Sequence, residues 1–485
     1  MKKLVLGIIA VYAFNFLSTA QSATWNAPVN VALGTTYSNI YPRITLTAGD
    51  NPLVIWGNGG TDRIYSSRWD GVGFTTPLAI NPLGTVPYLA SWTGAEITSS
   101  GDSVFVVFST DPNAAMDPHV YTIRSLDGGM TFQDTVRVDQ IGTDVPRFPS
   151  VAVGLNGNPV VNFMQFNASM TDPEYSIARS VNGGASYLAA ISPTASVAGY
   201  VCDCCPASIA ASGDRQVFLF RNDDNNIREM WGCYSTDGSA SFTAASEVDE
   251  TNWSVNSCPS SGPSGVIMGD SVVTTWMSAG DVYISSASLT TQQIGVHRPL
   301  FPMGTGVQNY PVIAGKGDTL AVVWQGMNGS FTDVFFTYSV TGTAGLGVNI
   351  DTLTQGTNGA QTRPDIQFSN GKFHITYSNN IGNNVVYLQG TIDPASLSVN
   401  ESEEVDLIRI FATQSEGKTI LQVKSELETT ASMQLINTAG QQISLDKQQI
   451  TKGVSMIAIP EVQKGIYFVV LETKEGKVYK QKVVL

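Results

Sequence analysis

Short apolar runs alternate with polar turns along most of the chain, and the pattern returns at a nearly fixed interval. A strand opening, often Pro-x-Ile or Pro-x-Val, occurs at Pro42, Ala95 (without proline), Pro149, Pro206, Pro259, Pro311 and Pro364. Successive openings are 53, 54, 57, 53, 52 and 53 residues apart. In each repeat a second apolar strand ends on an aromatic residue: Trp56, Phe108, Phe163, Phe220, Trp276, Trp324 and Tyr377. Four short strands at such a period are typical of one β-propeller blade.

The repeats predict an all-β fold, with a β-propeller over residues 24–395. Seven blades are favoured and six are the alternative. The last repeat ends after three strands, near Tyr387, so the N-terminal strand around Trp25 is expected to supply its fourth and to close the ring. After about residue 400 the chain has few aromatic residues, many lysines and short alternating strands. This change predicts a linker at 396–409 and a small β-sandwich at 410–485.

An eight-residue pattern stands at the turn between the third and fourth expected strands of several repeats. It is found at residues 125–132, 180–187 and 235–242, and the first of these reads SLDGGMTF. Asp and Gly favour the tight turn, Ser and Thr can bond its backbone, and the final aromatic residue can pack inward. The octets resemble the Asp-box, or BNR repeat, of the sialidase-type propellers. For the sialidase family this resemblance implies a β-propeller with six blades and an exo-sialidase site.

The last part of the chain carries a second resemblance. Gly465-Ile466-Tyr467 and the closing run from Lys480 to Leu485 resemble the C-terminal sorting domain of the type IX secretion system. The family implies a small β-sandwich that serves as an export address, type IX machinery as a partner and a Bacteroidota-type source. It implies export through the periplasm to the outer-membrane surface or beyond, often with cleavage of the domain. An ordinary small β-domain for binding is the alternative.

The N-terminus has the three parts of a secretion signal. Lys2 and Lys3 form a charged head, residues 4–17 are mostly apolar, and small residues at 18–20 suit cleavage. A signal peptide is therefore expected at 1–20, and no stretch is long enough to predict a membrane span. The 40 acidic residues outnumber the 26 basic ones, for a net charge of −14. Such a charge argues against nucleic acid as a partner.

Arginines gather where a propeller binds ligands, on the face where the innermost strands begin. This face is called the mouth below. Six arginines are expected there: Arg43, Arg63, Arg147, Arg221, Arg228 and Arg363. Guanidinium groups bind carboxylates with two parallel hydrogen bonds, so these residues predict recognition of an acidic glycan. The alternative is that they pair with acidic loop residues such as Asp62, Asp223 and Asp224.

The sialidase resemblance implies three catalytic residues: an Asp acid and a Tyr nucleophile activated by a Glu. Asp62 lies in the first repeat's loop, about where the family places its acid. Tyr310, like Tyr41, precedes a strand-opening proline and could face a ligand, and Glu229 could partner such a tyrosine. The family's later Glu followed closely by Arg is missing, which weakens an assignment as an active exo-sialidase.

Four of the five cysteines are expected to meet at the mouth. Cys205 and Cys258 each stand just before a strand-opening proline in neighbouring repeats, and Cys202 and Cys204 lie beside them. In an exported protein a disulfide is expected, for example from Cys205 or Cys204 to Cys258. The alternative is a thiolate site for Cu(I) or Zn, which would make the protein a metal-binding or redox propeller. Cys233 is expected to be a buried free thiol.

The loop from Asp223 to Asn226 could bind Ca²⁺, although an ordinary turn of this composition needs no ion. Taken together, the residues favour a secreted propeller that recognises an acidic glycan at its mouth. Active exo-sialidase and a metal-binding or redox propeller are the two alternatives.

Overall fold

The structure is a computed structural model that describes most of the chain after the first 21 residues. The described residues are 22–35, 38–115, 117–302, 307–392, 408–415, 418–437, 441–460, 462, 465–474 and 477–484. The chain divides into two compact units, Met1–Leu397 and Ser398–Leu485. The expected signal peptide and most of the expected linker at 396–409 lie outside the described residues. Within those residues, no helix has the length and apolar character that a membrane span requires.

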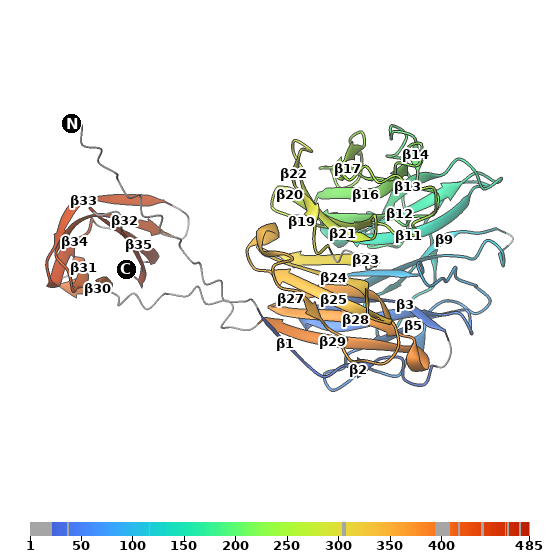
Figure 1. Cartoon of the computed structure of the whole chain (residues 1–485), viewed down its shortest axis with the longest axis horizontal. Coiled ribbons are helices and arrows are strands. Elements are labelled where there is room, and N and C mark those ends of the chain that lie inside the picture. The colour runs from blue at the N-terminus through green and yellow to red at the C-terminus, as the bar shows by residue number, and fades with distance from the viewer. Residues whose placement is uncertain are drawn as a thin grey trace, which may run out of the picture. The chain divides into compact units, whose positions relative to one another are not determined.

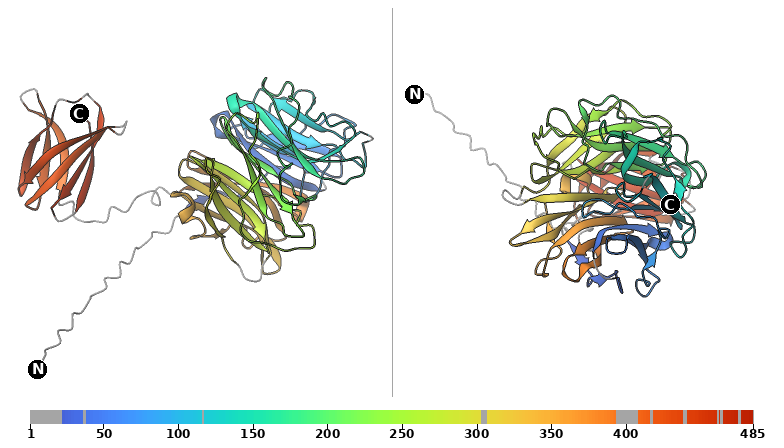
Figure 2. Two further views of the ribbon diagram at one scale, coloured as in Figure 1. Left: turned by 90° about the horizontal axis from the view of Figure 1, so that it is seen from above. Right: turned by 90° about the vertical axis from the view of Figure 1, so that its right-hand side faces the viewer.

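The described part of the first unit contains seven antiparallel sheets, arranged radially as propeller blades (Figures 1 and 2). This confirms the all-β propeller, and the seven sheets support seven blades over six. Blade 1 consists of β3 (Asn39–Thr47), β4 (Asn51–Asn58), β5 (Arg63–Arg68) and β6 (Leu78–Ala79). Blade 2 consists of β7 (Glu96–Ser100), β8 (Ser103–Ser109), β9 (Val120–Ser125) and β10 (Val136–Arg137). Blade 3 consists of β11 (Val145–Val153), β12 (Pro159–Phe166) and β13 (Glu174–Arg179). In blade 3 a single bridge between Ile177 and Ile191 stands in place of a fourth strand.

The remaining blades follow the same order from the centre outward. Blade 4 consists of β15 (Ser208–Ser212), β16 (Arg215–Asp223), β17 (Met230–Ser235) and β18 (Ser246–Glu247), and blade 5 of β19 (Ser264–Met268), β20 (Ser271–Ser278), β21 (Asp281–Ser288) and β22 (Ile294–Pro299). Blade 6 consists of β23 (Gln308–Lys316), β24 (Thr319–Asn328), β25 (Phe331–Ser339) and β26 (Asp351–Thr352), and blade 7 of β27 (Gln361–Ser369), β28 (Lys372–Asn379) and β29 (Asn384–Ile392). A short strand, β14 (Tyr200–Val201), pairs with the end of β16. Short 3₁₀ turns occur at Ala48–Asp50, Leu155–Gly157, Gly342–Gly345 and Ile381–Asn383.

The ring is closed by strands from opposite ends of the propeller. The innermost strands contact one another in cyclic order, β3, β7, β11, β15, β19, β23, β27 and back to β3. Two N-terminal strands, β1 (Ala23–Trp25) and β2 (Val29–Asn30), pair with β29, the outermost strand that blade 7 builds from its own repeat. The predicted closure of the last blade by the N-terminal strand is thereby confirmed.

The repeated aromatic position forms the core of the blades. The residues predicted to end the second strands are all buried: Trp56, Phe108, Phe163, Phe220, Trp276, Trp324 and Tyr377. In blades 1, 5 and 6 the aromatic residue stacks on its cross-strand partner, as Trp56 does on Tyr65 with ring centroids 5.9 Å apart. Cross-strand aromatic pairs add about 0.5–1.5 kcal/mol beyond the burial of their area. The repeat therefore encodes both the strand end and the packing between strands.

The three octets fold into one kind of turn. In each, the Ser hydroxyl accepts a hydrogen bond from a backbone N–H four residues on, at 2.9–3.0 Å, as Ser125 does from Gly129. The third residue of each octet, an Asp or Asn, accepts a hydrogen bond from the backbone N–H of the seventh residue, as Asp127 does from Thr131. These bonds hold the connection from the third to the fourth strand.

The second unit has two sheets packed around one core. One sheet holds β30 (Ile408–Ser415), β31 (Lys418–Ser425) and β34 (Gly453–Ala458); the other holds β33 (Gln442–Ile450), β32 (Thr429–Asn437), β35 (Ile466–Thr473) and β36 (Val478–Val484). Alternate side chains of both sheets form a single buried cluster that includes Leu421, Val423, Met433, Leu435 and Val469. Two sheets that share a core make a small β-sandwich, as predicted.

Candidate functional site

All seven blades contribute to a central cavity at the mouth. Its volume is about 140 Å³, and its walls are the first residues of the innermost strands and the segments just before them. One residue from the same place in each repeat lines it: Arg43, Glu96, Ser150, Ser208, Ser264, Val312 and Asp365. These side chains also join neighbouring blades, because Ile44 N–H donates to Asp365 at 2.8 Å and Ile313 N–H donates to Ser264 at 3.2 Å. The cavity is therefore a direct product of the repeat.

The innermost strands of four blades bend where they reach this cavity. Tyr41, Phe148, Tyr310 and Arg363 each precede a proline and have φ between 50° and 55°. The register with the next strand shifts at each of these points. Left-handed backbone is uncommon for bulky residues, and a residue before proline prefers extended conformations. Such strain often accompanies functional sites, and here it turns Tyr41, Tyr310 and Arg363 toward the cavity that they line.

A Tyr–Glu–Arg cluster occupies the side of the cavity formed by blades 1 and 2. The Tyr41 hydroxyl donates to Glu96 Oε1 at 2.6 Å, and Arg43 Nε lies 3.0 and 3.1 Å from the two Glu96 oxygens. The Arg43 guanidinium also stands 3.6 Å from the centre of the Tyr41 ring. Burial raises the pKa of Tyr41, with Glu96 adding to the effect. Burial alone would lower the pKa of Arg43, but Glu96, Tyr41 and Asp365 together outweigh it and hold that pKa above its ordinary value.

Arg363 presents a second cation to the same cavity, and its partners differ from those of Arg43. The residue is 8% exposed, and its guanidinium lies over the Tyr310 ring. Burial lowers the pKa of Arg363 to about 10, so the group stays charged at neutral pH. Its Nη1 is buried without a hydrogen-bond partner, and among the described residues no carboxylate forms an ion pair with it. Unlike Arg43, this arginine keeps a hydrogen-bonding group that no protein atom satisfies.

Asp365 is the buried acid of the cavity. Its two carboxylate oxygens accept hydrogen bonds from the N–H groups of Ile44 and Ile366, at 2.8 and 2.9 Å. Burial raises the pKa of Asp365 to about 6, although Arg43 and these hydrogen bonds oppose the rise. The carboxyl group can therefore gain or lose its proton close to neutral pH.

The other four predicted arginines lie away from the cavity lining. Arg221 is completely buried and donates to carbonyl oxygens of Ser261, Arg228 and Met277, so it has no exposed surface for a ligand. Arg228 pairs with Asp223 at 2.8 Å. The Arg228–Asp223 ion pair is the kind of pairing that had been the alternative, whereas Arg221 joins blades 4 and 5 through carbonyl oxygens.

Arg147 and Arg63 are partly buried. The Arg147 guanidinium lies 5.2 Å from the centre of the Tyr88 ring, and the Nε atoms of both arginines are buried without a hydrogen-bond partner. Neither lines the central cavity, so of the six only Arg43 and Arg363 do so.

The three predicted catalytic residues do not meet. Tyr310 lines the cavity, but Asp62 is exposed at the turn between β4 and β5. Glu229 lies in blade 4 and accepts a hydrogen bond from Asn252 N–H at 2.8 Å. The Tyr–Glu pair that the structure forms is instead Tyr41 with Glu96.

Glu96 and Asp365 were missed, although the repeat contains a signal for them. Both stand directly before the Ile that follows a strand opening, as Arg43 does before Ile44. Comparing that single position across the repeats would have placed Arg43, Glu96 and Asp365 on one ring. In blade 5 the innermost strand begins at Ser264, five residues after the predicted opening at Pro259, which hid the equivalent position there.

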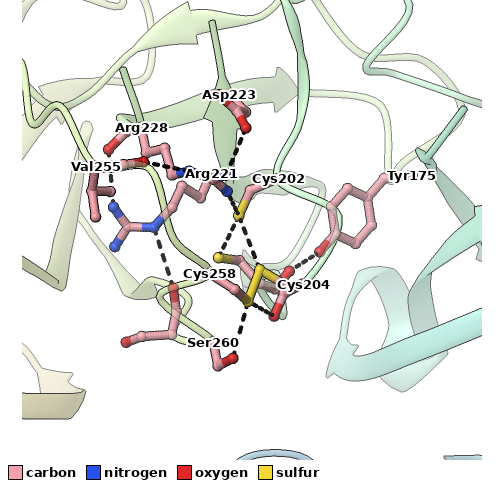
Figure 3. The surroundings of a disulfide bond; sticks show 11 residues. Tyr175, Cys202, Cys204, Arg221, Asp223, Arg228, Val255, Cys258 and Ser260 are labelled. Carbon is pink, nitrogen blue, oxygen red and sulfur yellow. Dashed lines mark hydrogen bonds and ion pairs between the residues drawn. A yellow bond between two sulfur atoms is a disulfide. The ribbon is translucent and has the colours of Figure 1, made fainter. Parts of the chain in front are cut away.

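The four mouth cysteines do meet, beside the cavity. Cys204 and Cys258 form a disulfide that joins blades 4 and 5, one of the two pairings expected. Cys202 and Cys205 are buried free thiols with their sulfur atoms 2.6 Å apart, and Cys202 Sγ lies 3.7 Å from Cys204 Sγ (Figure 3). Cys233 is also buried and free, and burial raises its pKa to about 12.

The sulfur cluster offers three possible ligands for a metal ion. Sulfur atoms of Cys202, Cys204 and Cys205 lie within 4.8 Å of one another. However, Cys204 is bonded to Cys258, which leaves two thiols. With Zn–S bonds of about 2.3 Å and tetrahedral angles, two ligand sulfurs stand about 3.8 Å apart. The 2.6 Å between Cys202 and Cys205 is too short for that, so these residues as arranged do not fit zinc.

The carboxylates of the loop considered for Ca²⁺ are bound by neighbouring residues of the same loop and by Arg228 just after it. Asp223 pairs with Arg228 and accepts from Asn226 N–H, while Asp224 accepts from the Asn225 side chain. Its carboxylates thus already have partners in the protein.

Similar solved structures include two sialidases and a polysaccharide lyase. The Hadza microbial sialidase Hz136 is 11% identical over 76% of this chain and 69% of its own, with a TM-score of 0.44. Trypanosoma rangeli sialidase in complex with 2,3-difluorosialic acid is 11% identical over 95% of this chain and 89% of its own, also with a TM-score of 0.44. Polysaccharide lyase Uly1 is 12% identical over 75% and 92%, with a TM-score of 0.48.

No curated protein matches the chain. The C-terminal unit, in contrast, has a recognised family. Residues 416–485 match the secretion system C-terminal sorting domain, which confirms the predicted sorting domain and indicates export to the cell surface or secretion.

Proposed function

We propose that the propeller recognises an acidic glycan by binding a carboxylate group of the sugar in the central cavity. The observation that carries the proposal is Arg363, a buried cation whose Nη1 faces no hydrogen-bond partner. A carboxylate there would complete its hydrogen bonding and balance its charge. Arg43, already paired with Glu96, would add a second positive edge to the site.

The size of the cavity limits what it can accept. Its volume of about 140 Å³ is well below the roughly 300 Å³ at which pockets for whole small molecules begin. A terminal carboxylate with the adjoining sugar atoms matches this space, whereas the rest of a glycan would extend over the mouth. Tyr310 and Trp92, which also line the cavity, offer aromatic faces for that part.

A pair of ligands that differ only in charge tests the proposal. Sialic acid and its methyl ester are titrated into the mature protein by calorimetry. We expect the acid to bind and the ester to bind at least about tenfold more weakly, because a hydrogen bond to a charged group contributes about 1.5–3 kcal/mol. Arg363→Gln should lose the same factor for the acid. Arg215→Gln, at the half-buried start of β16 where the side chain donates to Gly269 O, is the matched control and should bind as the wild type does. Equal binding of acid and ester would exclude a carboxylate site.

Hydrolysis of a terminal acidic sugar is the second candidate function. It is favoured by the Tyr41–Glu96 hydrogen bond of 2.6 Å in the same cavity as Asp365, whose pKa of about 6 suits a proton donor. Glu96 could take the proton of Tyr41 as the tyrosine attacks the anomeric carbon. Release of a fluorescent phenol from its sialoside would be lost in Tyr41→Phe and kept in Tyr310→Phe. Absence of release by the wild-type protein would leave recognition as the function.

The sorting domain provides the cellular setting for either function. We infer that it acts as an address for the type IX machinery and that the propeller works outside the outer membrane. Appending residues 410–485 to an unrelated periplasmic protein in a host with that machinery should move the protein to the cell surface or medium. Retention in the periplasm would contradict this assignment.

A further inference from the structure

The cysteine cluster between blades 4 and 5 contains two sulfur pairs, one oxidised and one reduced. Neither pair has a part in the proposed glycan site. One sulfur pair, Cys204–Cys258, is a disulfide that reaches the surface, since Cys258 is exposed. The other pair, Cys202 and Cys205, consists of thiols with at most 1% of either residue exposed. A buried dithiol thus stands directly behind a surface disulfide.

The surroundings of Cys202 favour its thiolate. Arg228 Nη1 lies 2.9 Å from Cys202 Sγ, and Asp223 holds Arg228 in place through an ion pair of 2.8 Å. Figure 3 shows the Cys202 sulfur between this arginine and the disulfide. The hydrogen bond from the Cys205 thiol is the largest cause that lowers the pKa of Cys202, to about 7; burial opposes it, and Arg228 and Arg221 add to the lowering. Burial and the same hydrogen bond raise the pKa of Cys205.

We propose that the four mouth cysteines form a thiol–disulfide exchange centre, in which the buried Cys202–Cys205 pair reduces the surface Cys204–Cys258 disulfide. The 3.7 Å from Cys202 Sγ to Cys204 Sγ brings the attacking sulfur into contact with the bond to be broken. The Cys202 side chain, being buried, has no comparable access to a disulfide outside the protein.

The exchange balances within the protein. The Cys202 thiolate attacks Cys204 Sγ, a Cys202–Cys204 bond forms, and Cys258 leaves as a thiolate that takes a proton from solvent. Cys205 then loses its proton and attacks Cys202 Sγ, 2.6 Å away, and Cys204 leaves as a thiolate that is protonated in turn. Two electrons pass from the buried pair to the surface pair, so no external oxidant or reductant is needed.

The product differs from the starting state in two ways. Thiols now stand at the rim, where Cys258 can react with thiols and disulfides of other molecules. Blades 4 and 5 are no longer cross-linked by a disulfide beside Ser260 and Pro263, which line the cavity. This chemistry does not depend on what the cavity binds, and its test is independent of any glycan.

Alkylation and peptide mapping test the exchange directly. The full-length protein is fully reduced and then oxidised with one equivalent of diamide, so that one disulfide forms per chain. Native protein is next treated with N-ethylmaleimide, digested and analysed by mass spectrometry. We expect maleimide on Cys204 and Cys258 together with a Cys202–Cys205 disulfide, because alkylation of the rim thiols draws the exchange forward. An intact Cys204–Cys258 disulfide, with Cys202 and Cys205 alkylated only after denaturation, would overturn the proposal.

Two variants separate exchange from direct oxidation of the buried pair. Cys205→Ser keeps a hydroxyl donor beside Cys202 but cannot complete the second step, so it should stop at a Cys202–Cys204 disulfide with one maleimide on Cys258. In Cys204→Ser the buried pair should stay reduced under the same treatment; a Cys202–Cys205 disulfide there would mean direct oxidation and overturn the relay. Cys233→Ser removes the remaining buried thiol and should react as the wild type does. If a variant fails to fold, an intact Cys204–Cys258 disulfide in the wild-type map still overturns the proposal.

Discussion

At the scale of single residues, the cavity holds a few charged side chains, and the net charge that a ligand meets depends on how they pair and on which are protonated. Arg43 is neutralised by Glu96, whereas no carboxylate of the described residues pairs with Arg363. Asp365 adds a negative charge only when it is ionised, and its pKa of about 6 makes that charge variable near neutral pH. The affinity of the cavity for an anion should therefore depend on the protonation of one buried carboxyl group.

Binding of a carboxylate ligand should strengthen as the pH falls from 7.5 to 5. Asp365 takes up a proton over this range, so the negative charge near Arg43 and Glu96 decreases while a sugar carboxylate stays ionised. Titrating sialic acid at several pH values should show an affinity that rises several-fold around pH 6. Asp365→Asn should remove most of this dependence. If its pH profile matches that of the wild-type protein, another group is responsible.

Glu96→Gln should raise the affinity for a carboxylate by roughly tenfold, because it releases Arg43 for the ligand. The amide oxygen can still accept the Tyr41 hydroxyl, so the side of the cavity keeps its shape. The same variant should lose any hydrolytic activity, since Glu96 would no longer take a proton. Calorimetry and a fluorescent sialoside assay measure the two effects separately, and weaker ligand binding would show that Glu96 helps to hold the ligand.

At the scale of elements, the octet turns illustrate how one sequence pattern can stabilise several blades. The pKa of Asp127 is lowered to about 2, with the hydrogen bonds from the Thr131 hydroxyl and N–H as the largest causes. The stabilisation by this carboxylate is present above the ordinary Asp pKa and is lost as the pH falls through about 2. Blade 3 uses Asn182 in the equivalent place with the same backbone bond.

Asp127→Ala should destabilise the propeller by about 1–2 kcal/mol, because two hydrogen bonds to Thr131 are lost. Asp127→Asn should cost less, since blade 3 forms this turn with Asn182. Urea denaturation at neutral pH compares the two variants with the wild-type protein. Equal losses for Ala and Asn would mean that the charge, and not the backbone bond, holds the turn.

The repeat made most of the elements predictable, because strand period and aromatic position reflect local packing that every blade shares. The cavity was harder to predict, since its residues are turned inward by left-handed backbone before proline at Tyr41, Tyr310 and Arg363. A proline in sequence indicates a strand opening, but it does not reveal that bend. The pairing of Cys204, rather than Cys205, with Cys258 likewise depends on side-chain direction and not on spacing.

At the scale of the whole molecule, the propeller is a closed ring in which no blade is independent. The innermost strands contact one another all the way round, and β1 and β2 complete blade 7. Arg43 and Arg363 come from blades 1 and 7, which flank the point of closure. The position of the proposed anion site thus depends on a junction made by the N-terminal segment.

Trp25 is the side chain that should matter most for this closure. Its ring packs edge-on against Phe336 with centroids 4.9 Å apart, and it lies over Gly390, where an added Cβ would stand 2.5 Å from the Trp25 ring. Trp25→Ala should lower the free energy of unfolding by about 2–3 kcal/mol, somewhat less than for a fully buried tryptophan. Gly390→Ala should destabilise the same junction through a clash.

Because the ring is continuous, both changes should shift one cooperative transition of the whole propeller and should also weaken carboxylate binding at Arg363. Thr24→Ala, an exposed neighbour in β1, is the matched control and should leave both properties unchanged. Chemical denaturation followed by tryptophan fluorescence, together with ligand titration, measures the two outcomes. If Trp25→Ala unfolds at the wild-type denaturant concentration, then β1 only covers the edge of blade 7, and the seven blades hold their ring without it.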